Sequence, residues 1–448
     1  MADTISKNDL TTGPILKKLI VFFLPIAAGT LFQQLYNAVD ALVVGKYVGT
    51  GALAAVGGSP AQIINLIIGF CVALCSGAAV VIAQLYGGRD FQRSSVAIQT
   101  SYVFSAILGL AVGILVIAFT PQILTVLKTP ADTLEAAIRY QRIYFTGSVF
   151  LLTFNMGSSI LRAVGNSQFP FLCLCVGCVL NISLDILFVI AFQMGVAGVA
   201  WATVIAQGVS AVLVTVKLLR TPEDYRLTLS GLRLNRLLLR RMMHIGIPSG
   251  LQSSMYGFSN MILQIGINLL GTVVVASWTM SGKIDGAYWA VSGAFGTAIT
   301  TFIGQNYGAG NIDRIRECAK KGMLLFLGMT VGMSGLIMLA AKPLLHLFTD
   351  DGAVISTTYT IFLFFVPLYV LWSAIEVYSG VLRGVGDTVI PSIIIGVGIC
   401  LFRILWVLTV FRTVHTLSSI CLCYPISWGI TDIAIYIYYR KRSIVAKA

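Results

Sequence analysis

Ionisable side chains lie inside long apolar stretches of this sequence, where charge is rare. The embedded acids are Asp40, Asp185, Asp285, Glu376 and Asp432, and the embedded bases are Lys283 and Arg403. An ionised group in the hydrocarbon layer of a membrane is costly, so each of these residues is a candidate for ion binding, ligand binding or helix pairing.

Two of the acids have polar neighbours at helical spacing. Asn37 precedes Asp40 by three residues, and Asn181 precedes Asp185 by one turn, so each pair shares a helix face. With Thr203, the acids and Asn181 lie roughly 6–14 Å below the outer membrane surface at 1.5 Å per residue. Two carboxylates, an amide and a hydroxyl could bind a hard cation such as Na⁺ or share a proton. Alternatively, each acid only holds neighbouring helices together.

The composition requires a membrane around these residues. The chain has 448 residues, of which 57% are hydrophobic and 10% are charged, whereas soluble domains carry about a quarter charged residues. Apolar stretches of about 20 residues recur along the whole length, and each can span a bilayer as a helix. The sequence therefore predicts an all-α integral membrane protein.

Twelve membrane-spanning helices are expected, in two sets of six. Their predicted ranges are 15–44, 57–85, 94–119, 136–162, 168–191, 195–219, 242–271, 276–305, 318–341, 355–382, 390–411 and 415–439. The longest polar connection lies at the midpoint of the chain. We therefore predict an N-lobe over 1–219, a basic cytoplasmic linker over 220–241 and a C-lobe over 242–448.

Basic residues predict the orientation. The net charge is +13, and the bases lie mostly in short loops, which argues against a nucleic-acid partner. With the N-terminus inside, the inner segments hold 22 Lys and Arg and the outer ends hold 6. This bias places both termini in the cytoplasm of a multi-pass protein, which we expect in a bacterial cytoplasmic membrane.

The two halves of the chain repeat one another at an offset of 221 to 223 residues. The matching landmarks are Pro25 with Pro248, Gln84–Gly87 with Gln305–Gly308, and Leu161–Asn166 with Leu382–Asp387. Because each half holds six spans, both halves enter the membrane in the same direction. The lobes are then related by a pseudo-two-fold axis along the membrane normal, an arrangement suited to alternating access.

The repeat helps to distinguish residues that bind an ion from residues that stabilise the fold, because a stabilising residue would be expected in both halves. Asp40, Asn181 and Asp185 align with Leu263, Phe402 and Trp406, so the second half has lost each polar member. This one-sided pattern favours a single ion site in the first half.

Other polar residues are candidates for a substrate cavity, namely Glu376, Asn155, Tyr36 and Gln34. Glu376 aligns with Asn155 and could bind a cationic substrate or carry a second proton. Asp285 could instead pair with Arg403, and Lys283 with Glu376.

The arginines and prolines at equivalent positions of the two halves can be interpreted either as structural or as functional residues. Arg162 and Arg383 end their helices beside glycine turns, where an arginine can contact headgroups or cap carbonyls. Pro25 and Pro248 interrupt the first helix of each half. Pro25 could be a static kink or a hinge that couples protonation of Asp40 to a bend.

With these landmarks in place, the chain resembles transporters of the multidrug and toxic compound extrusion (MATE) family from about 15 to 440. The resemblance rests on Pro25 through Asp40, on Gln-x-Tyr-Gly at Gln84 and Gln305, and on Leu-Arg-x-Val-Gly-[Asn/Asp] at Leu161 and Leu382. It implies two six-helix lobes around a cavity and export of amphiphilic, often cationic compounds in exchange for H⁺ or Na⁺.

The resemblance also implies site residues. Asp40, Asn181, Asp185 and Thr203 match the N-lobe cation site of the branch related to DNA-damage-inducible exporters, and Pro25 matches its bending proline. Other branches rely on an acid in the seventh helix, but 242–271 contains none. This departure argues against coupling through that helix.

Two other functions remain as alternatives. A flippase for lipid-linked oligosaccharides or cell-wall precursors would need a strongly cationic cavity, and only two bases are embedded. A membrane enzyme would need a catalytic set, yet the three His residues are far apart and no phosphate-binding loop is present. We therefore expect no enzyme activity, no cofactor beyond a possible coupling Na⁺, no disulfide framework among the nine Cys, and a monomer.

Overall fold

The first half of the chain forms eight α-helices. The protein, seen here as a computed structural model, is described over residues 9–228 and 231–442, and no β-strand occurs in these ranges. The elements are α1 (Ile15–Val43), the π-helical turn η1 (Val44–Val48), α2 (Thr50–Gly57), α3 (Ser59–Gly87), α4 (Phe91–Val126), α5 (Ala131–Thr146), α6 (Ser148–Ala163), α7 (Gln168–Asp185), the π-helical turn η2 (Ile186–Ala191) and α8 (Val196–Arg220).

The second half is likewise helical. Its elements are α9 (Arg236–Asn268), α10 (Thr272–Gly308), α11 (Ile312–Phe348), α12 (Gly352–Phe365), η4 (Val366–Leu371), α13 (Trp372–Gly384), α14 (Val389–Ile395), η5 (Gly396–Leu401), α15 (Phe402–Trp406), η6 (Val407–Phe411), α16 (Arg412–Val414) and α17 (Leu417–Lys441). The predicted linker 220–241 therefore overlaps the end of α8 and the first residues of α9.

Joining consecutive elements gives the twelve predicted spans. Nine of the described helical segments are long and apolar enough to cross a membrane. A tenth span is the pair α5 and α6, which is bent by 48° at Gly147. The remaining two are α9 and α10, which have 33 and 37 residues and carry more polar side chains. The prediction of an all-α membrane protein is thus confirmed.

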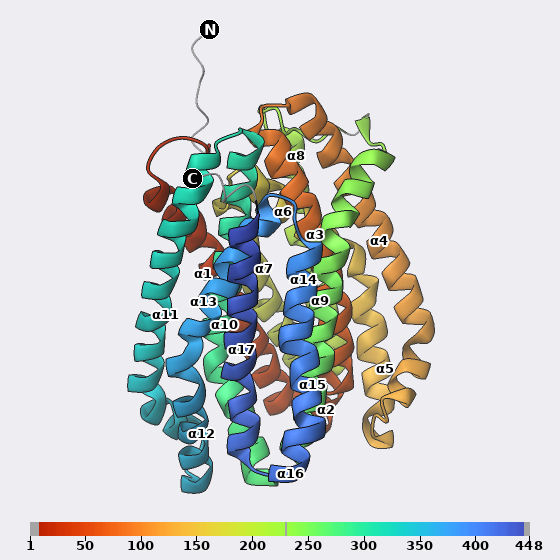
Figure 1. Cartoon of the computed structure of the whole chain (residues 1–448). Helices are drawn as coiled ribbons and strands as arrows, with labels where there is room; N and C mark the ends of the chain where they lie inside the picture. The colour runs from red at the N-terminus through yellow and green to blue at the C-terminus, as the bar shows by residue number, and fades with distance from the viewer. Residues whose placement is uncertain (1–8, 229–230, 443–448) are drawn as a thin grey trace.

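The two lobes stand side by side and exchange contacts through their first helices (Figure 1). In the C-lobe core, Leu19, Phe22 and Phe23 of α1 pack with Phe295 and Ile299 of α10. The N-lobe core shows the counterpart, because α9 contributes side chains to a cluster built on α3, α4 and α6. The first helix of each lobe therefore packs against the core of the other lobe, as the pseudo-two-fold repeat requires.

Large apolar side chains cover the outer faces of the bundle. Examples with more than half of their surface exposed are Leu110, Ile114 and Phe119 on α4 and Leu336 and Leu339 on α11. Such faces suit lipid, which solvates apolar side chains and leaves backbone groups to bond within helices.

The lobes are joined at the end of the bundle where α3 and α10 finish, which we call the terminus-bearing end. Gln84 of α3 donates to the carbonyl of Gly384 (2.8 Å) and accepts from Arg241 (2.6 Å). Gln305 of α10 donates to the carbonyl of Ala163 (2.7 Å). These two glutamines and their two carbonyls occupy equivalent positions in the repeat. Each lobe therefore donates one hydrogen bond to the other at this end of the bundle.

Glycines allow the backbones of α3 and α10 to meet there. Gly87 lies against the backbone of Gln305, and Gly308 lies against the carbonyl of Gln84, with no room for a Cβ at either glycine. The Gln-x-Tyr-Gly repeat thus supplies both the hydrogen bonds and the close approach. The bundle is closed at this end.

We expect Gly308→Ala to lower thermal stability by several degrees. The added methyl group overlaps the Gln84 carbonyl, and overpacking of this kind costs about 1–3 kcal/mol. The matched control is Gly328→Ala on α11, where nothing lies within 4 Å of the new Cβ and Ala is the better helix former. Thermal unfolding of the two purified variants is compared with that of the wild type. Equal midpoints for Gly308→Ala and Gly328→Ala would contradict the close contact between the lobes.

Candidate functional site

The acids of the two predicted pairs meet in the N-lobe. The carboxyl groups of Asp40 on α1 and Asp185 on α7 lie on either side of the same amide, that of Asn181. In the amide orientation that satisfies its neighbours, the nitrogen of Asn181 donates to Asp40 (2.9 Å) and to Asp185 (3.2 Å), and its oxygen accepts from the backbone N–H of Thr203 (3.3 Å). Four of the predicted residues therefore form one cluster, named here the acid cluster.

Tyr36 completes the acid cluster from the cavity side. It lies one helical turn before Asp40 on α1 and borders the same cavity as Asn181 and Thr203. Asp185, Asn181 and Thr203 are 0%, 1% and 3% exposed. The cluster is therefore shielded from lipid and approached from the side of Tyr36.

The two helices that carry the acids change their winding beside the cluster. The π-helical turn η2 begins directly after Asp185, and η1 begins four residues after Asp40. A π-helical turn widens the helix and frees backbone carbonyls from the regular ladder, and such turns are frequent at functional sites. Local winding thus contributes to the place where the acids meet.

This geometry supports two kinds of chemistry. Two carboxyl groups that lie this close in a low dielectric repel each other when both are ionised, so the pair is suited to bind a proton. Without a proton, the carboxylate oxygens and the Thr203 hydroxyl are ligands of the kind that a hard cation prefers, and the Asn181 amide would have to turn its oxygen toward the acids to join them. In the described ranges no group of three or more His, Cys, Asp and Glu could hold a metal ion, so such a cation would depend on neutral ligands.

Two predicted residues lie outside the acid cluster. Asn37 and Gln34 are exposed on α1, and neither makes a hydrogen bond with another described residue. Gln34 faces α10 near Gly286, while its neighbour Gln33 lines the cavity. Spacing of three residues placed Asn37 on the face of Asp40 only approximately, because successive residues on a helix differ by 100° in direction.

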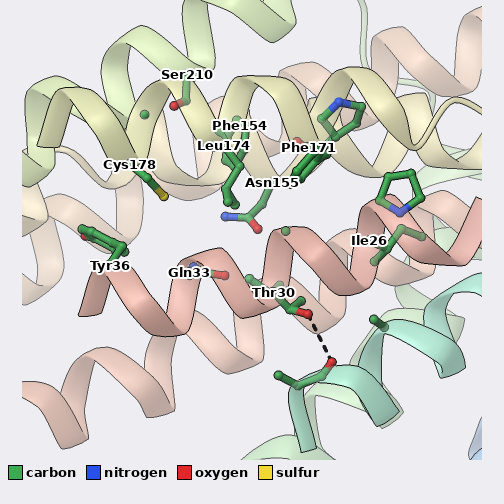
Figure 2. A pocket seen from close by; sticks show the side chains of 18 of the residues that line it. Ile26, Thr30, Gln33, Tyr36, Phe154, Asn155, Phe171, Leu174, Cys178 and Ser210 are labelled. Atoms are coloured by element: carbon green, nitrogen blue, oxygen red, sulfur yellow. Dashed lines mark hydrogen bonds between the residues drawn. The ribbon is translucent and has the colours of Figure 1, made fainter. Parts of the chain in front are cut away.

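A cavity of about 450 Å³ opens beside the acid cluster and is named here the main cavity. Figure 2 shows Thr30, Gln33 and Tyr36 on α1 facing Phe154, Asn155 and Leu174 across this space. Asn181 and Thr203 line it as well, so the cluster and the cavity share a wall. The sequence-based assignment of Asn155 and Tyr36 to a cavity agrees with this placement.

Pro25 also lines the main cavity. The helix α1 continues through it, and the interruption lies about four turns before Asp40 at 3.6 residues per turn. Thr30, between the two, donates to the carbonyl of Ala290 on α10 (3.3 Å). A bend at Pro25 would therefore change both the cavity wall and the contact between the lobes.

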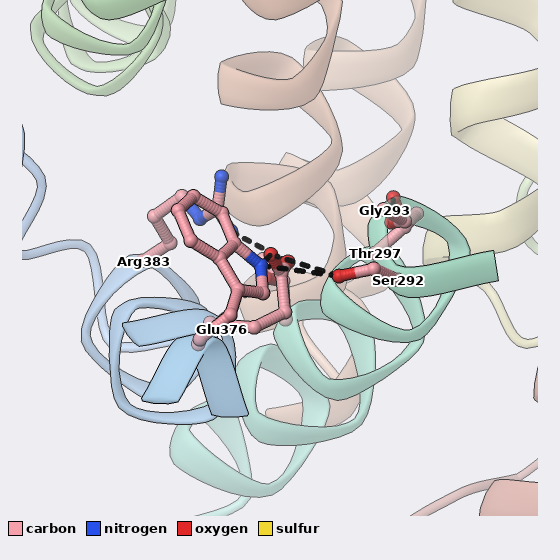
Figure 3. A network of polar contacts seen from close by, with 8 residues as sticks. Ser292, Gly293, Thr297, Glu376 and Arg383 are labelled. Atoms are coloured by element: carbon pink, nitrogen blue, oxygen red, sulfur yellow. Dashed lines mark hydrogen bonds and ion pairs between the residues drawn. The ribbon is translucent and has the colours of Figure 1, made fainter. Parts of the chain in front are cut away.

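Glu376 lines a second, more polar cavity of about 330 Å³ between the lobes, named here the polar chamber. Its carboxylate forms an ion pair with Arg383 (3.7 Å) and accepts from Trp372 (3.0 Å) and Ser292 (3.5 Å). Figure 3 shows Glu376 and Arg383 on α13 beside Ser292 on α10. Arg383 thus has a side-chain partner in the cavity, which differs from the predicted contact with headgroups or carbonyls.

Two of the remaining embedded charges, Asp285 and Arg403, have partners other than those considered from the sequence. Asp285 accepts from the hydroxyl of Tyr369 (3.0 Å) and from Trp289 (3.3 Å). Arg403 lies over the ring of Tyr424, 3.9 Å from its centroid. Pairing of Asp285 with Arg403, and of Lys283 with Glu376, is therefore not found.

Sequence reasoning missed the position of Arg162. It was interpreted as a cap at the end of α6, yet its side chain lines both the main cavity and the polar chamber. The available signal was its match to Arg383 in the second half. Equivalent residues of two symmetry-related lobes approach each other when they lie near the axis.

Comparisons with known proteins agree with this architecture. The model of the MatE family matches residues 25–187 and 248–409, one segment in each lobe. The chain is 24% identical to the probable multidrug resistance protein YoeA of Bacillus subtilis (strain 168), over 95% of this chain and 93% of that protein. It is 22% identical to the multidrug export protein MepA of Staphylococcus aureus (strain NCTC 8325 / PS 47), over 77% of this chain and 76% of that protein.

Solved structures share the fold. A crystal structure of MATE in complex with MaL6 superposes with a TM-score of 0.92 at 23% identity, over 99% of this chain and 100% of that one. An outward-facing multidrug resistance MATE family transporter of the MOP superfamily gives a TM-score of 0.91 at 23% identity, over 99% of both chains. The family model covers most of the chain and one segment in each lobe, so this chain belongs to the MatE family of membrane transporters.

Proposed function

We propose that this protein is a secondary active multidrug efflux antiporter. It exports amphiphilic, often cationic organic compounds in exchange for H⁺ or Na⁺ by alternating access. The observation that carries this proposal is the shared wall between the acid cluster and the main cavity. Because Asn181 contacts both acids and lines the cavity together with Tyr36 and Thr203, an ion bound by the acids changes the surface that a substrate contacts.

The main cavity suits an apolar solute with few polar groups. Its wall combines apolar and aromatic side chains such as Phe154, Phe171 and Leu174 with a small number of amides and hydroxyls. Ligand sites of this composition bind by apolar burial and use the polar groups for orientation. The relatives named as multidrug resistance and multidrug export proteins support an exported drug-like substrate.

The cycle follows from the closed terminus-bearing end. In the proposed orientation this end faces the cytoplasm of a bacterial cell, so the structure is a state closed to the inside. An ion arrives at Asp40 and Asp185 from outside, alters the hydrogen bonds of Asn181 to the acids, and releases substrate. The lobes then separate at Gln84 and Gln305 to admit the next substrate from the cytoplasm.

Coupling requires that substrate and ion bind in alternation. An acid pair that holds one proton still carries one negative charge, which attracts an organic cation into the adjoining cavity, whereas a pair that has bound a second proton or Na⁺ is neutral. Proton or Na⁺ binding removes that attraction. A substrate bound tightly before ion binding is therefore bound weakly after it, which is the differential affinity that drives a population shift.

We expect Asp40→Asn to abolish gradient-driven efflux while the protein still inserts and folds. The amide keeps the size of the side chain and can still accept from Asn181, but it cannot release a proton or supply a second negative charge. Efflux of ethidium is measured in vesicles with an imposed pH or Na⁺ gradient, and the gradient that works identifies the coupling ion.

The matched control for this variant is Asp132→Asn. Asp132 is exposed in the first turn of α5 and lies in neither cavity, so this change should leave efflux at the wild-type rate. Survival of efflux in Asp40→Asn would remove the acid cluster from the coupling step. Absence of wild-type efflux under both gradients would contradict antiport itself.

We expect Pro25→Ala to slow efflux about tenfold, equivalent to ~1.4 kcal/mol in the barrier, without a loss of folded protein. Alanine restores a backbone N–H that can complete the helix and stiffen α1 at the bend. Pro248→Ala is the comparison, because its half of the chain lacks the acids. Efflux rates and thermal midpoints are measured for both variants. A similar slowing by both substitutions would count against a hinge specific to α1.

A further inference from the structure

Arg162 is an embedded base without an acidic partner. Its guanidinium donates to the hydroxyl of Ser159 (3.0 Å), and within residues 9–228 and 231–442 it forms no ion pair. The side chain lines both the main cavity and the polar chamber. A guanidinium in the interior of a membrane protein is costly unless a counter-charge or a ligand compensates it.

The polar chamber has one positive charge in excess. Two guanidinium groups line it, those of Arg162 and Arg383, and the lining contains one carboxylate, that of Glu376. Glu376 is engaged within its own lobe by Arg383, Trp372 and Ser292. Its carboxylate therefore compensates Arg383 and leaves Arg162 uncompensated.

Packing against α10 helps to hold Glu376 in that position. One carboxylate oxygen occupies the space that a Cβ of Gly296 would fill, and a guanidinium nitrogen of Arg383 lies 3.5 Å from the same point. The acid is seated in a notch of the neighbouring helix α10, which adds to the contacts that hold it beside Arg383.

Hydrogen-bond donors near the two arginines lack acceptors. The hydroxyls of Ser158, in the main cavity, and of Ser379, in the polar chamber, have no partner among the described residues, and neither has Nε of Arg383. These serines are 2% and 4% exposed. A buried polar atom left unpaired costs about 1–3 kcal/mol. Guanidinium groups only donate and hydroxyls can donate, so one kind of partner, an acceptor, would satisfy all three groups, and an anionic acceptor would also compensate the excess positive charge.

The main cavity is therefore charged differently at its two ends. Arg162 lies at the end of α6, a short turn before α7 begins at Gln168, whereas Asn181 of the acid cluster lies eleven residues after Pro170, roughly 16 Å along α7 at 1.5 Å per residue. Apolar side chains, including Phe171 and Leu174, line the wall between them. An acid end, an apolar middle and a basic end together complement a zwitterionic amphiphile.

We propose that Arg162 binds the oxyanion group, a carboxylate or phosphate, of an exported zwitterionic amphiphile. The cationic end of the same molecule points toward the acid cluster, and Ser158 and Ser379 donate to the oxyanion. This assignment rests on the proposed efflux function and narrows its substrate class. It does not depend on which ion drives transport.

Binding of a matched dye pair to the purified protein tests this assignment. Rhodamine B carries a cationic ring system and a carboxylate, and its ethyl ester keeps the rings but lacks the anion. By fluorescence anisotropy, we expect the wild type to bind rhodamine B more tightly than the ester. Equal affinities in the wild type would overturn the oxyanion site without reference to any variant.

Substitution of the arginine sharpens the test. We expect Arg162→Gln to weaken rhodamine B binding about tenfold, equivalent to ~1.4 kcal/mol, and to leave the ester unaffected, while Arg162→Lys keeps most of the preference. The control is Arg139→Gln, a loss of the same charge at an exposed position on α5, which should change neither affinity. Equal weakening of both dyes by Arg162→Gln would show that Arg162 only supports the fold, and would overturn the proposal.

Competition with lipids shows whether the oxyanion comes from a membrane lipid or from a solute. A separate consideration distinguishes failure of the oxyanion site from failure of the proposed efflux function. If either phosphatidylglycerol or phosphatidylcholine displaces rhodamine B from the wild type, the site belongs to lipid phosphate and the assignment to an exported solute is overturned. Inhibition by neither lipid supports a solute. The binding measurement uses no gradient, so a failure of ion-driven efflux would remove the proposed function and leave the dye preference as an independent result.

Discussion

The reciprocal contact between Gln84 and Gln305 is the constraint on which the rest of the arrangement depends. Each glutamine reaches the carbonyl at the end of a helix in the opposite lobe, and glycines let α3 and α10 meet beside them. Because the lobes are held together at this end, the space between them lies toward the middle of the bundle. The main cavity and the polar chamber owe their positions to this closure.

The two lobes differ in their buried acidic residues, and this difference provides the groups that can bind ions. The N-lobe keeps Asp40 and Asp185 in contact, where the C-lobe has Leu263 and Trp406. The C-lobe in turn places an acid, Glu376, at the position of Asn155. A symmetric pair of lobes supplies two states of similar energy, and the unequal charges give ligands a reason to prefer one of them.

Low dielectric makes each of these few polar groups important. A charge or an unpaired donor has no water to compensate it inside the bundle, so its partners are either other side chains or ligands. Asp285 and Arg403 find side-chain partners in Tyr369 and Tyr424. The acid cluster and Arg162 instead border the main cavity, where mobile ions and solutes can supply the missing partner.

Much of the architecture follows from local pattern. Long apolar runs, their twofold repetition and the asymmetric loss of acids predicted twelve spans, two lobes and a cluster of Asp40, Asn181, Asp185 and Thr203, and the structure brings these four residues together. Helix ends were less accurate: α4 and α11 extend beyond the predicted 94–119 and 318–341, because a helix continues past the apolar layer wherever its polar ends find hydrogen bonds.

The sequence by itself determined that this is an α-helical membrane protein, that its two halves repeat, and which residues form the acid cluster. Long apolar runs, repeated motifs and acidic residues within apolar runs are all visible in the local sequence. Only the tertiary structure decided that Gln33 rather than Gln34 faces the cavity, that Glu376 pairs with Arg383, and that Arg162 stands between two cavities. Those outcomes depend on the rotation of each helix about its axis and on which helices adjoin across the lobes. Packing between distant segments sets both, and no local pattern records it.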